Sequence, residues 1–390
     1  YHLYAVGPHC RAMLLGAKLS RQMPHLFPPD LYDEMAVDNP RGHTARRAIK
    51  WFTAQALPDL TMAPFGDMGG RVSLGTYPLT AEIGYRYLGI EEVGHYPEFR
   101  RGGRSLVGLL YGAGTIDPKP YSHPSALLSS GHAALRRRTK DNHLYAGLNA
   151  LQPGSSHSHG DRLNLITYSR DRLLAGEKRT LYTNPEQRTY SGASYGHNTV
   201  TVDETSQEHG DRLSGERVPR IETFVDLPVF QAAEARGDGV YPTTEIYRRL
   251  VCQFDEYLVD LFRVEGGKTH DWFHHGIGGE PIVSIPMQRE DSFQPARYVV
   301  AGERAYRTGE TDGPFTVTWT IQAQKGADYA GRRRDVHSRV TLAGQPGQRV
   351  NVLSTYPNPG RHSLMVRHAG PSSLFAAVHE AYFDAPIAEA

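Results

Sequence analysis

The chain has 390 residues, of which 39% are hydrophobic and 22% are charged, and its formal net charge is +1. A chain of this length exceeds most single cores and predicts two domains, while the near-neutral charge argues against a nucleic-acid partner. Its two cysteines exclude a disulfide framework, and no apolar run is long enough for a membrane-spanning helix. We therefore expect a soluble globular protein without a membrane partner. These totals leave open its oligomeric state and a periplasmic, secreted or cytoplasmic location.

The first part of the chain carries the apolar spacing of helices. Hydrophobic side chains recur every three or four residues in 3–17 and 45–56, and a further helix is predicted to start after Pro78. Connectors rich in proline and glycine, such as 23–29 and 63–70, separate these segments. The pattern predicts a helical array with long loops.

From about His143 the apolar spacing changes to a period of two, which is typical of strands. Tyr247–Val264 predicts a hairpin that turns at Asp255-Glu256. Other predicted strands occupy 163–168, 198–203, 315–323, 350–355 and 363–368. Short strands after a helical block, without alternation of the two, predict an α+β chain. We place a helical domain at 1–135 and a large antiparallel β-sandwich at 136–390.

Two histidines, His157 and His159, stand two residues apart before the apolar run 163–168. In an extended strand, residues at this spacing share a face, so both imidazoles would point the same way. The pair is compatible with a surface loop, a zinc site or a catalytic site. A cupin would place a carboxylate shortly after the second histidine, where Leu163-Asn164 stand, and no HExxH motif supports a zinc hydrolase.

The segment 154–168 holds this pair, followed by Asp161 and an apolar strand, and 197–203 reads His-Asn-Thr-Val-Thr-Val-Asp. Together the two segments resemble the HxH strand and the HNTV-x-VD strand of the heparinase II/III-like polysaccharide lyase family. Tyr1-His2-Leu3-Tyr4 resembles the family's Tyr-His-x-Tyr run at the start of a toroid helix. The resemblance implies a partial α/α toroid in the helical domain and β-elimination on an acidic, uronate-containing polysaccharide or oligosaccharide. The oligoalginate and exo-acting branch is closest in its motifs, and heparin or heparan sulfate is the main alternative substrate.

The resemblance also implies catalytic residues. In β-elimination the uronate carboxylate is neutralised, a base removes the C5 proton, and an acid protonates the departing O4 oxygen. Histidine and tyrosine suit these roles because neutral donors and tunable pKa values are needed. By position, His157 matches the catalytic histidine, Tyr1 or in its place Tyr4 matches the catalytic tyrosine, and Tyr182 matches a loop tyrosine beside the cleft.

Metal and substrate contacts follow from the same resemblance. His159 and His197 match the zinc ligands of some members, but the family's aspartate between them is absent and Glu177 is the candidate replacement. A structural zinc and a metal-free packing pair are therefore both open. Arg162 and His275 are expected to bind the acidic substrate.

The start of the chain bears on activity. The family has a further histidine-bearing helix upstream of the catalytic tyrosine, whereas this chain begins at Tyr1. We expect the chain to be the C-terminal part of a longer enzyme with an incomplete toroid. A non-catalytic carbohydrate-binding sandwich is the alternative if upstream helices are absent.

Overall fold

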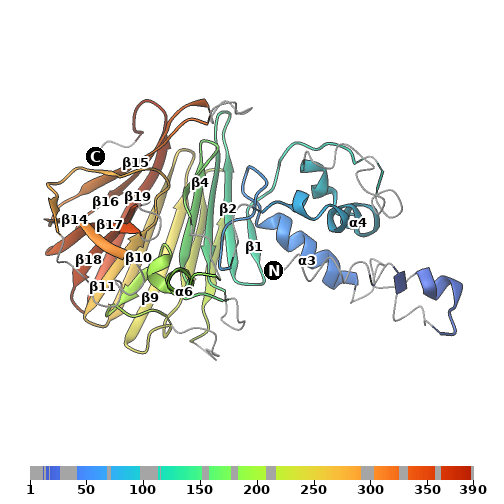
Figure 1. Cartoon of the computed structure of the whole chain (residues 1–390), viewed down its shortest axis with the longest axis horizontal. Coiled ribbons are helices and arrows are strands. Elements are labelled where there is room, and N and C mark those ends of the chain that lie inside the picture. Colours follow the sequence, from blue (N-terminus) through green and yellow to red (C-terminus); the bar gives the residue numbers. More distant parts are fainter. Residues whose placement is uncertain are drawn as a thin grey trace. The chain divides into compact units, whose positions relative to one another are not determined.

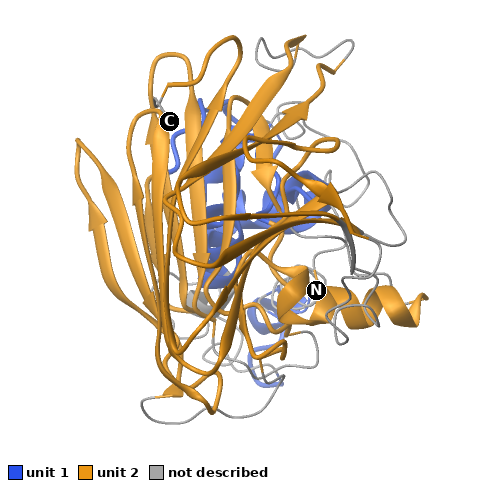
Figure 2. Ribbon diagram, turned by 90° about the vertical axis from the view of Figure 1, so that its left-hand side faces the viewer, with its two compact units in different colours: residues 1–63, 71–123 blue, residues 64–70, 124–390 orange. Residues whose placement is uncertain are grey.

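The computed structural model describes residues 12, 15–16, 18–26, 42–67, 72–96, 113–114, 116–151, 158–176, 183–207, 217–290, 303–324, 333–355 and 362–387. The chain divides into two compact units, which Figure 2 shows in different colours. Unit 1 comprises residues 1–63 and 71–123, and unit 2 comprises residues 64–70 and 124–390.

Unit 1 contains the helices α3 (Gly42–Ala54) and α4 (Pro78–Leu88), which confirm the predictions at 45–56 and after Pro78. Proline suits the first position of α4, because an N–H at that position would have no partner within the helix. Gly89 ends the helix with a φ of 61°. The 3-10 turns η2 (Leu74–Thr76) and η3 (Glu91–His95) flank α4. In the part of the chain that the structure describes, no helix is long and apolar enough to cross a membrane. The described helices do not by themselves show a toroid.

Unit 2 is built from antiparallel sheets, which confirms the predicted sandwich (Figure 1). A five-stranded sheet has the order β1 (Ala126–Leu128), β2 (His132–Arg138), β3 (His143–Asn149), β4 (Asn164–Ser169) and β5 (Arg172–Ala175). An eight-stranded sheet has the order β12 (Ile282–Val283), β15 (Phe315–Ile321), β16 (Val336–Leu342), β19 (Ser372–Tyr382), β10 (Tyr257–Gly266), β9 (Thr244–Gln253), β8 (Gln231–Arg236) and β7 (Arg220–Asp226). A six-stranded sheet has the order β13 (Gln288–Arg289), β14 (Glu303–Thr311), β17 (Gln348–Thr355), β18 (His362–Ala369), β11 (Thr269–His274) and β6 (Val200–Val202).

One hydrophobic core joins the three sheets. It includes Leu135 of the five-stranded sheet, Phe262 of the eight-stranded sheet and Trp272 of the six-stranded sheet. Along β9, buried and partly exposed side chains alternate, as expected for a strand with one face on the core. The predicted hairpin is formed by β9 and β10, which pair antiparallel around Asp255-Glu256. The short helix α6 (Pro185–Gly192) and the 3-10 turn η5 (Ser194–Gly196) lie between β5 and β6 along the chain.

The boundary between the units differs from the predicted one at 135/136. That position falls inside β2, which pairs with β1 and β3, so the hydrogen-bonded hairpin brings the start of unit 2 forward to Pro124. The segment Pro64–Gly70 also belongs to unit 2, although unit 1 residues flank it in the sequence. Strand pairing and long-range contacts determine where unit 2 starts and why Pro64–Gly70 belongs to it. Neither can be read from the local spacing of hydrophobic residues.

Candidate functional site

The structure describes some of the predicted site residues. His159, Arg162, His197 and His275 are among them. The remaining predicted residues lie outside the described residues: Tyr1, Tyr4, His157, Glu177 and Tyr182. Their assigned roles stay predictions.

Two asparagines bring the two histidine motifs together. The backbone N–H of Asn198 donates to Asn164 Oδ1 at 3.0 Å, and the Asn198 amide donates to the Leu165 carbonyl at 2.9 Å. Asn198 Oδ1 also accepts from the backbone N–H of His275 at 2.6 Å. Asn198 therefore ties the start of β4, the loop before β6 and the end of β11 through buried hydrogen bonds.

The two motif histidines lie side by side in the interior. The ring centres of His159 and His197 are 5.3 Å apart, with 45° between the ring planes. Both residues are buried. Burial lowers the pKa of His197, because the charged imidazolium loses its hydration, while Asp161 and a backbone hydrogen bond with Ser191 oppose the shift. His197 is therefore neutral at pH 7.

His159 has a carboxylate partner that the sequence pattern did not indicate. Its Nε2 lies 2.9 Å from Asp67 Oδ1, and the two side chains are 6% and 11% exposed. Asp67 lies in the glycine-rich connector 63–70, which was read as a loop, and Gly66-Asp67 carried no signal beyond turn composition. Phe65 of the same segment packs against His132, with ring centres 5.0 Å apart.

His132 is a further buried imidazole, and it lies outside both motifs. Burial lowers its pKa to about 4, and the nearby Asp161 carboxylate opposes this shift. His132 Nδ1 lies 3.1 Å from Ser130 Oγ. The Asp161 carboxylate opposes the lowering of the pKa of His197 as well, so its charge acts on both buried imidazoles. Nothing in the sequence distinguished His132 from an ordinary histidine at the start of a strand.

Gly160 allows the loop to pass close to the turn before β6. A Cβ atom at Gly160 would lie 2.8 Å from both Ser194 Oγ and Ser206 Oγ, and the Gly160 N–H donates to the Gly192 carbonyl at 2.8 Å. A larger residue would push this loop away. The glycine of the first motif, which follows His159 in the chain, therefore leaves room for two serine hydroxyls.

Arg162 is 1% exposed. Its guanidinium donates to the His159 carbonyl at 3.0 Å, and its own backbone carbonyl accepts from Thr199 Oγ1 at 2.8 Å. Gln207 Oε1 accepts from its backbone N–H at 2.9 Å. These contacts hold the loop that carries His159, and a contact between Arg162 and substrate stays a prediction.

The adjacent histidines at the end of β11 face opposite ways, because successive side chains alternate across a strand. The His274 ring stacks on Trp272 and lies 5.2 Å from the ring of Trp319, inside the sandwich. The His275 ring stacks on Phe273, and its Nδ1 lies 2.8 Å from Ser363 Oγ. His275 is buried in this arrangement. A contact between His275 and substrate stays a prediction.

A buried ion pair between two strands of the eight-stranded sheet contacts both motif loops. Arg249 and Asp260, on neighbouring strands β9 and β10, form two hydrogen bonds of 2.8 and 2.6 Å. The same guanidinium donates to the carbonyls of Leu163 and Asn198 at 2.6 and 2.5 Å. Leu163 has a φ of 62°, an uncommon conformation for leucine. Arg249 therefore holds the entries to β4 and β6 in place.

The described residues fit a metal site only in part. Two imidazoles on one tetrahedral zinc, with bonds of about 2 Å, have ring centres about 5 Å apart, which agrees with His159 and His197. Among the described residues, however, no three histidine, cysteine, aspartate or glutamate side chains gather as a metal-binding group. A third ligand would have to come from the undescribed residues, where Glu177 lies.

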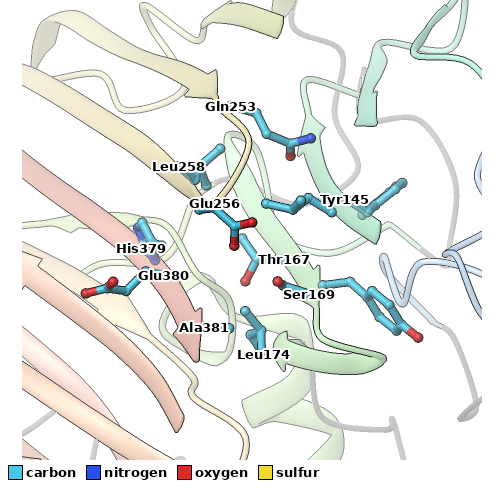
Figure 3. Close-up of a pocket in the computed structure, with 12 residues that line it drawn as sticks. Tyr145, Thr167, Ser169, Leu174, Gln253, Glu256, Leu258, His379, Glu380 and Ala381 are labelled. Atoms are coloured by element: carbon cyan, nitrogen blue, oxygen red, sulfur yellow. The ribbon is translucent and has the colours of Figure 1, made fainter. Parts of the chain in front are cut away.

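A pocket elsewhere in unit 2 is separate from this cluster. It is a small, partly open pocket between β3–β5 and the strands β10 and β19 (Figure 3). The polar side chains at its edge include Gln253, Glu256 and His379, and the remaining lining is largely apolar. Thr167 and Tyr168 at the end of the first motif line it, but none of the predicted site residues does, so the pocket is not the site that the motif histidines define.

The comparisons with known proteins agree with this architecture. Residues 120–274 match the family described as Heparinase II/III-like, C-terminal, which confirms the resemblance drawn from the motifs. No curated protein matches the chain by sequence.

Solved structures share the fold. A mutant heparan sulfate lyase from Pedobacter heparinus is 14% identical, with a TM-score of 0.60, and the match covers 100% of this chain and 52% of that protein. A heparinase III gene product is also 14% identical, with a TM-score of 0.62, and the match covers 98% of this chain and 51% of that protein. This chain thus spans about half the length of these two proteins.

Proposed function

Because residues 120–274 match the heparinase II/III-like C-terminal family, we propose that this chain is the sandwich-bearing part of a polysaccharide lyase. The reaction is β-elimination on a uronate-containing polysaccharide. The observation that carries the proposal is the joining of the two histidine motifs, in which His159 lies beside the buried, neutral His197 and Asn198 bridges the motif loops. A neutral imidazole can accept a proton, which an imidazolium cannot.

In this proposal, His157 is the general base or its partner at the C5 proton. Tyr1, or Tyr4 in its place, protonates the departing O4 oxygen, and Tyr182 borders the cleft. The C5–H bond breaks, a C4–C5 double bond forms, and the C4–O4 bond breaks as the oxygen gains a proton. The described residues Asn198, Arg162 and Gly160 hold the chain around His159 and His197 in place, and His159 follows His157 by two residues in the sequence.

We propose two substrate classes for the test. Unsulfated alginate or its oligomers is the first, because the motifs look closest to the oligoalginate branch and the chain lacks a strongly basic composition. Heparan sulfate is the second, and it is favoured by the solved structures that share the fold, which include heparan sulfate lyases.

We also propose that His159 and His197 hold a structural zinc, with Glu177 as the third ligand. The spacing of the two rings supports this, and the ion would cross-link the two motif loops. The elimination chemistry itself is assigned to the side chains, because it requires no activated water.

The experiment is to incubate the full-length protein with alginate, heparan sulfate, hyaluronan and their oligomers, and to follow the ultraviolet absorbance of the unsaturated uronate product. We expect a rise with one of them. His157→Ala should abolish the rise, whereas His337→Ala, on strand β16, should not change it. No rise with any substrate would overturn the lyase proposal, and binding without a rise would indicate a carbohydrate-binding sandwich.

A further inference from the structure

A carboxylate from outside the sandwich strands reaches the motif histidine. Asp67 Oδ1 lies 2.9 Å from His159 Nε2, although 92 residues separate the two in the sequence. Asp67 belongs to the segment Pro64–Gly70, which is grouped with unit 2, so the contact is internal to that unit. Both side chains are largely buried, and water therefore competes little for either atom.

This contact determines which ring nitrogen of His159 carries the hydrogen. An ionised carboxylate has no hydrogen to donate and can only accept. Nε2 must therefore be the donor, and in the neutral imidazole Nδ1 then carries the lone pair. His159 Nδ1 is buried and has no hydrogen-bond partner among the described residues. A buried lone pair of this kind is costly unless the site uses it.

We propose that Asp67 is a positioning residue for the motif site: it holds His159 as the Nε2–H tautomer and so makes Nδ1 the atom through which His159 acts. The role given to Nδ1 rests on the proposed function: in the lyase site, this nitrogen would accept a hydrogen bond or bind a cation. The carboxylate–imidazole arrangement itself rests only on the geometry. Carboxylates that orient an imidazole in this way typically change activity or metal affinity by about 10- to 100-fold when removed.

The test is tautomer measurement by nitrogen-15 NMR at one neutral pH on the full-length protein labelled at histidine. The His159 signal is identified by its loss in His159→Gln. In the wild type, we expect the pattern of an imidazole protonated on Nε2. Asp67→Asn, whose amide can donate as well as accept, should shift the signal toward the Nδ1–H form or an average of the two. Asp67→Glu should retain the wild-type tautomer.

Asp226→Asn, the same chemical change at an exposed residue at the end of β7, is the matched control and should leave the His159 signal unchanged. An unchanged His159 tautomer in folded Asp67→Asn would overturn the proposal, as would a wild type protonated on Nδ1. If Asp67→Asn does not fold, the spectra of the wild type and of Asp67→Glu still show whether His159 carries its hydrogen on Nε2, as the proposal requires.

The activity arm separates this proposal from the lyase proposal. With a substrate that is cleaved, Asp67→Asn should lower kcat about 10- to 100-fold and leave KM nearly unchanged, and Asp67→Glu should restore part of the loss. Equal kcat values would overturn the positioning role. If no polysaccharide is cleaved, the lyase proposal fails, while the tautomer measurement still decides whether Asp67 orients His159.

Discussion

Replacing Arg249 by methionine should destabilise the sandwich more than most single substitutions. Arg249 and Asp260 are both fully buried, and each oxygen of the carboxylate accepts a hydrogen bond from the guanidinium. Burial alone raises the pKa of Asp260, and the Arg249 charge outweighs this effect and holds the pKa well below its usual range. Without Arg249, the carboxylate would be buried without its main partner.

The size of the effect can be worked out from these contacts. Removing one partner of a buried ion pair costs about 3–5 kcal/mol, because the remaining charge is not compensated. The carbonyls of Leu163 and Asn198 also lose a donor, at about 1 kcal/mol or more each when they stay buried. We expect a loss of about 5–7 kcal/mol, which is a large share of the roughly 5–15 kcal/mol that stabilises a typical domain.

Urea unfolding followed by tryptophan fluorescence checks this prediction. Trp272 and Trp319 are buried in the sandwich core, so a Trp51→Phe background restricts the signal to unit 2. Arg263→Met is the matched control, because Arg263 is 56% exposed and pairs with Glu265 on the surface, where such a pair contributes about 1 kcal/mol or less. Arg249→Met and Asp260→Leu together should cost less than Arg249→Met alone, since the unpaired charge is removed. A loss below about 1 kcal/mol in Arg249→Met would refute this reasoning.

Three further predictions concern the motif cluster. The pKa of His132 is about 4 in the folded chain and about 6.5 when unfolded, so its contribution to stability is complete above pH 6.5 and is lost as the pH falls toward 4. His132→Gln should therefore reduce the loss of unfolding free energy between pH 7 and pH 5 by about 2 kcal/mol, and an unchanged pH dependence in urea titrations would contradict this. Gly160→Ala should cost about 1–3 kcal/mol, because its Cβ would meet the Ser194 hydroxyl at 2.8 Å, and a thermal midpoint equal to that of the wild type would show that the loop yields freely. If zinc is bound, a chelator should lower the thermal midpoint of the wild type and have no effect on His197→Ala, with metal content measured in both; equal responses would remove the metal proposal.

Local features of the sequence were sufficient for much of the fold. The helices after Pro78 and at 45–56, and the β9–β10 hairpin around Asp255-Glu256, follow from hydrophobic spacing and turn residues close together in the chain. Such patterns arise because each element buries one face, so its own residues record where the core lies. The sandwich unit begins at Pro124, upstream of the predicted boundary at 135/136, because it includes the hairpin of β1 and β2, which was not among the predicted strands.

The sequence by itself determined the two histidine motifs, and with them the family resemblance that residues 120–274 confirm. Only the tertiary structure decided that Asn198 bridges the motifs, that Asp67 reaches His159 and that Arg249 supports both loops. The physical reason is distance along the chain: a hydrogen bond between residues 92 positions apart leaves no local pattern, because its geometry depends on how every intervening element packs. Burial, which sets the low pKa values of His132 and His197, likewise arises only when the sheets close over them.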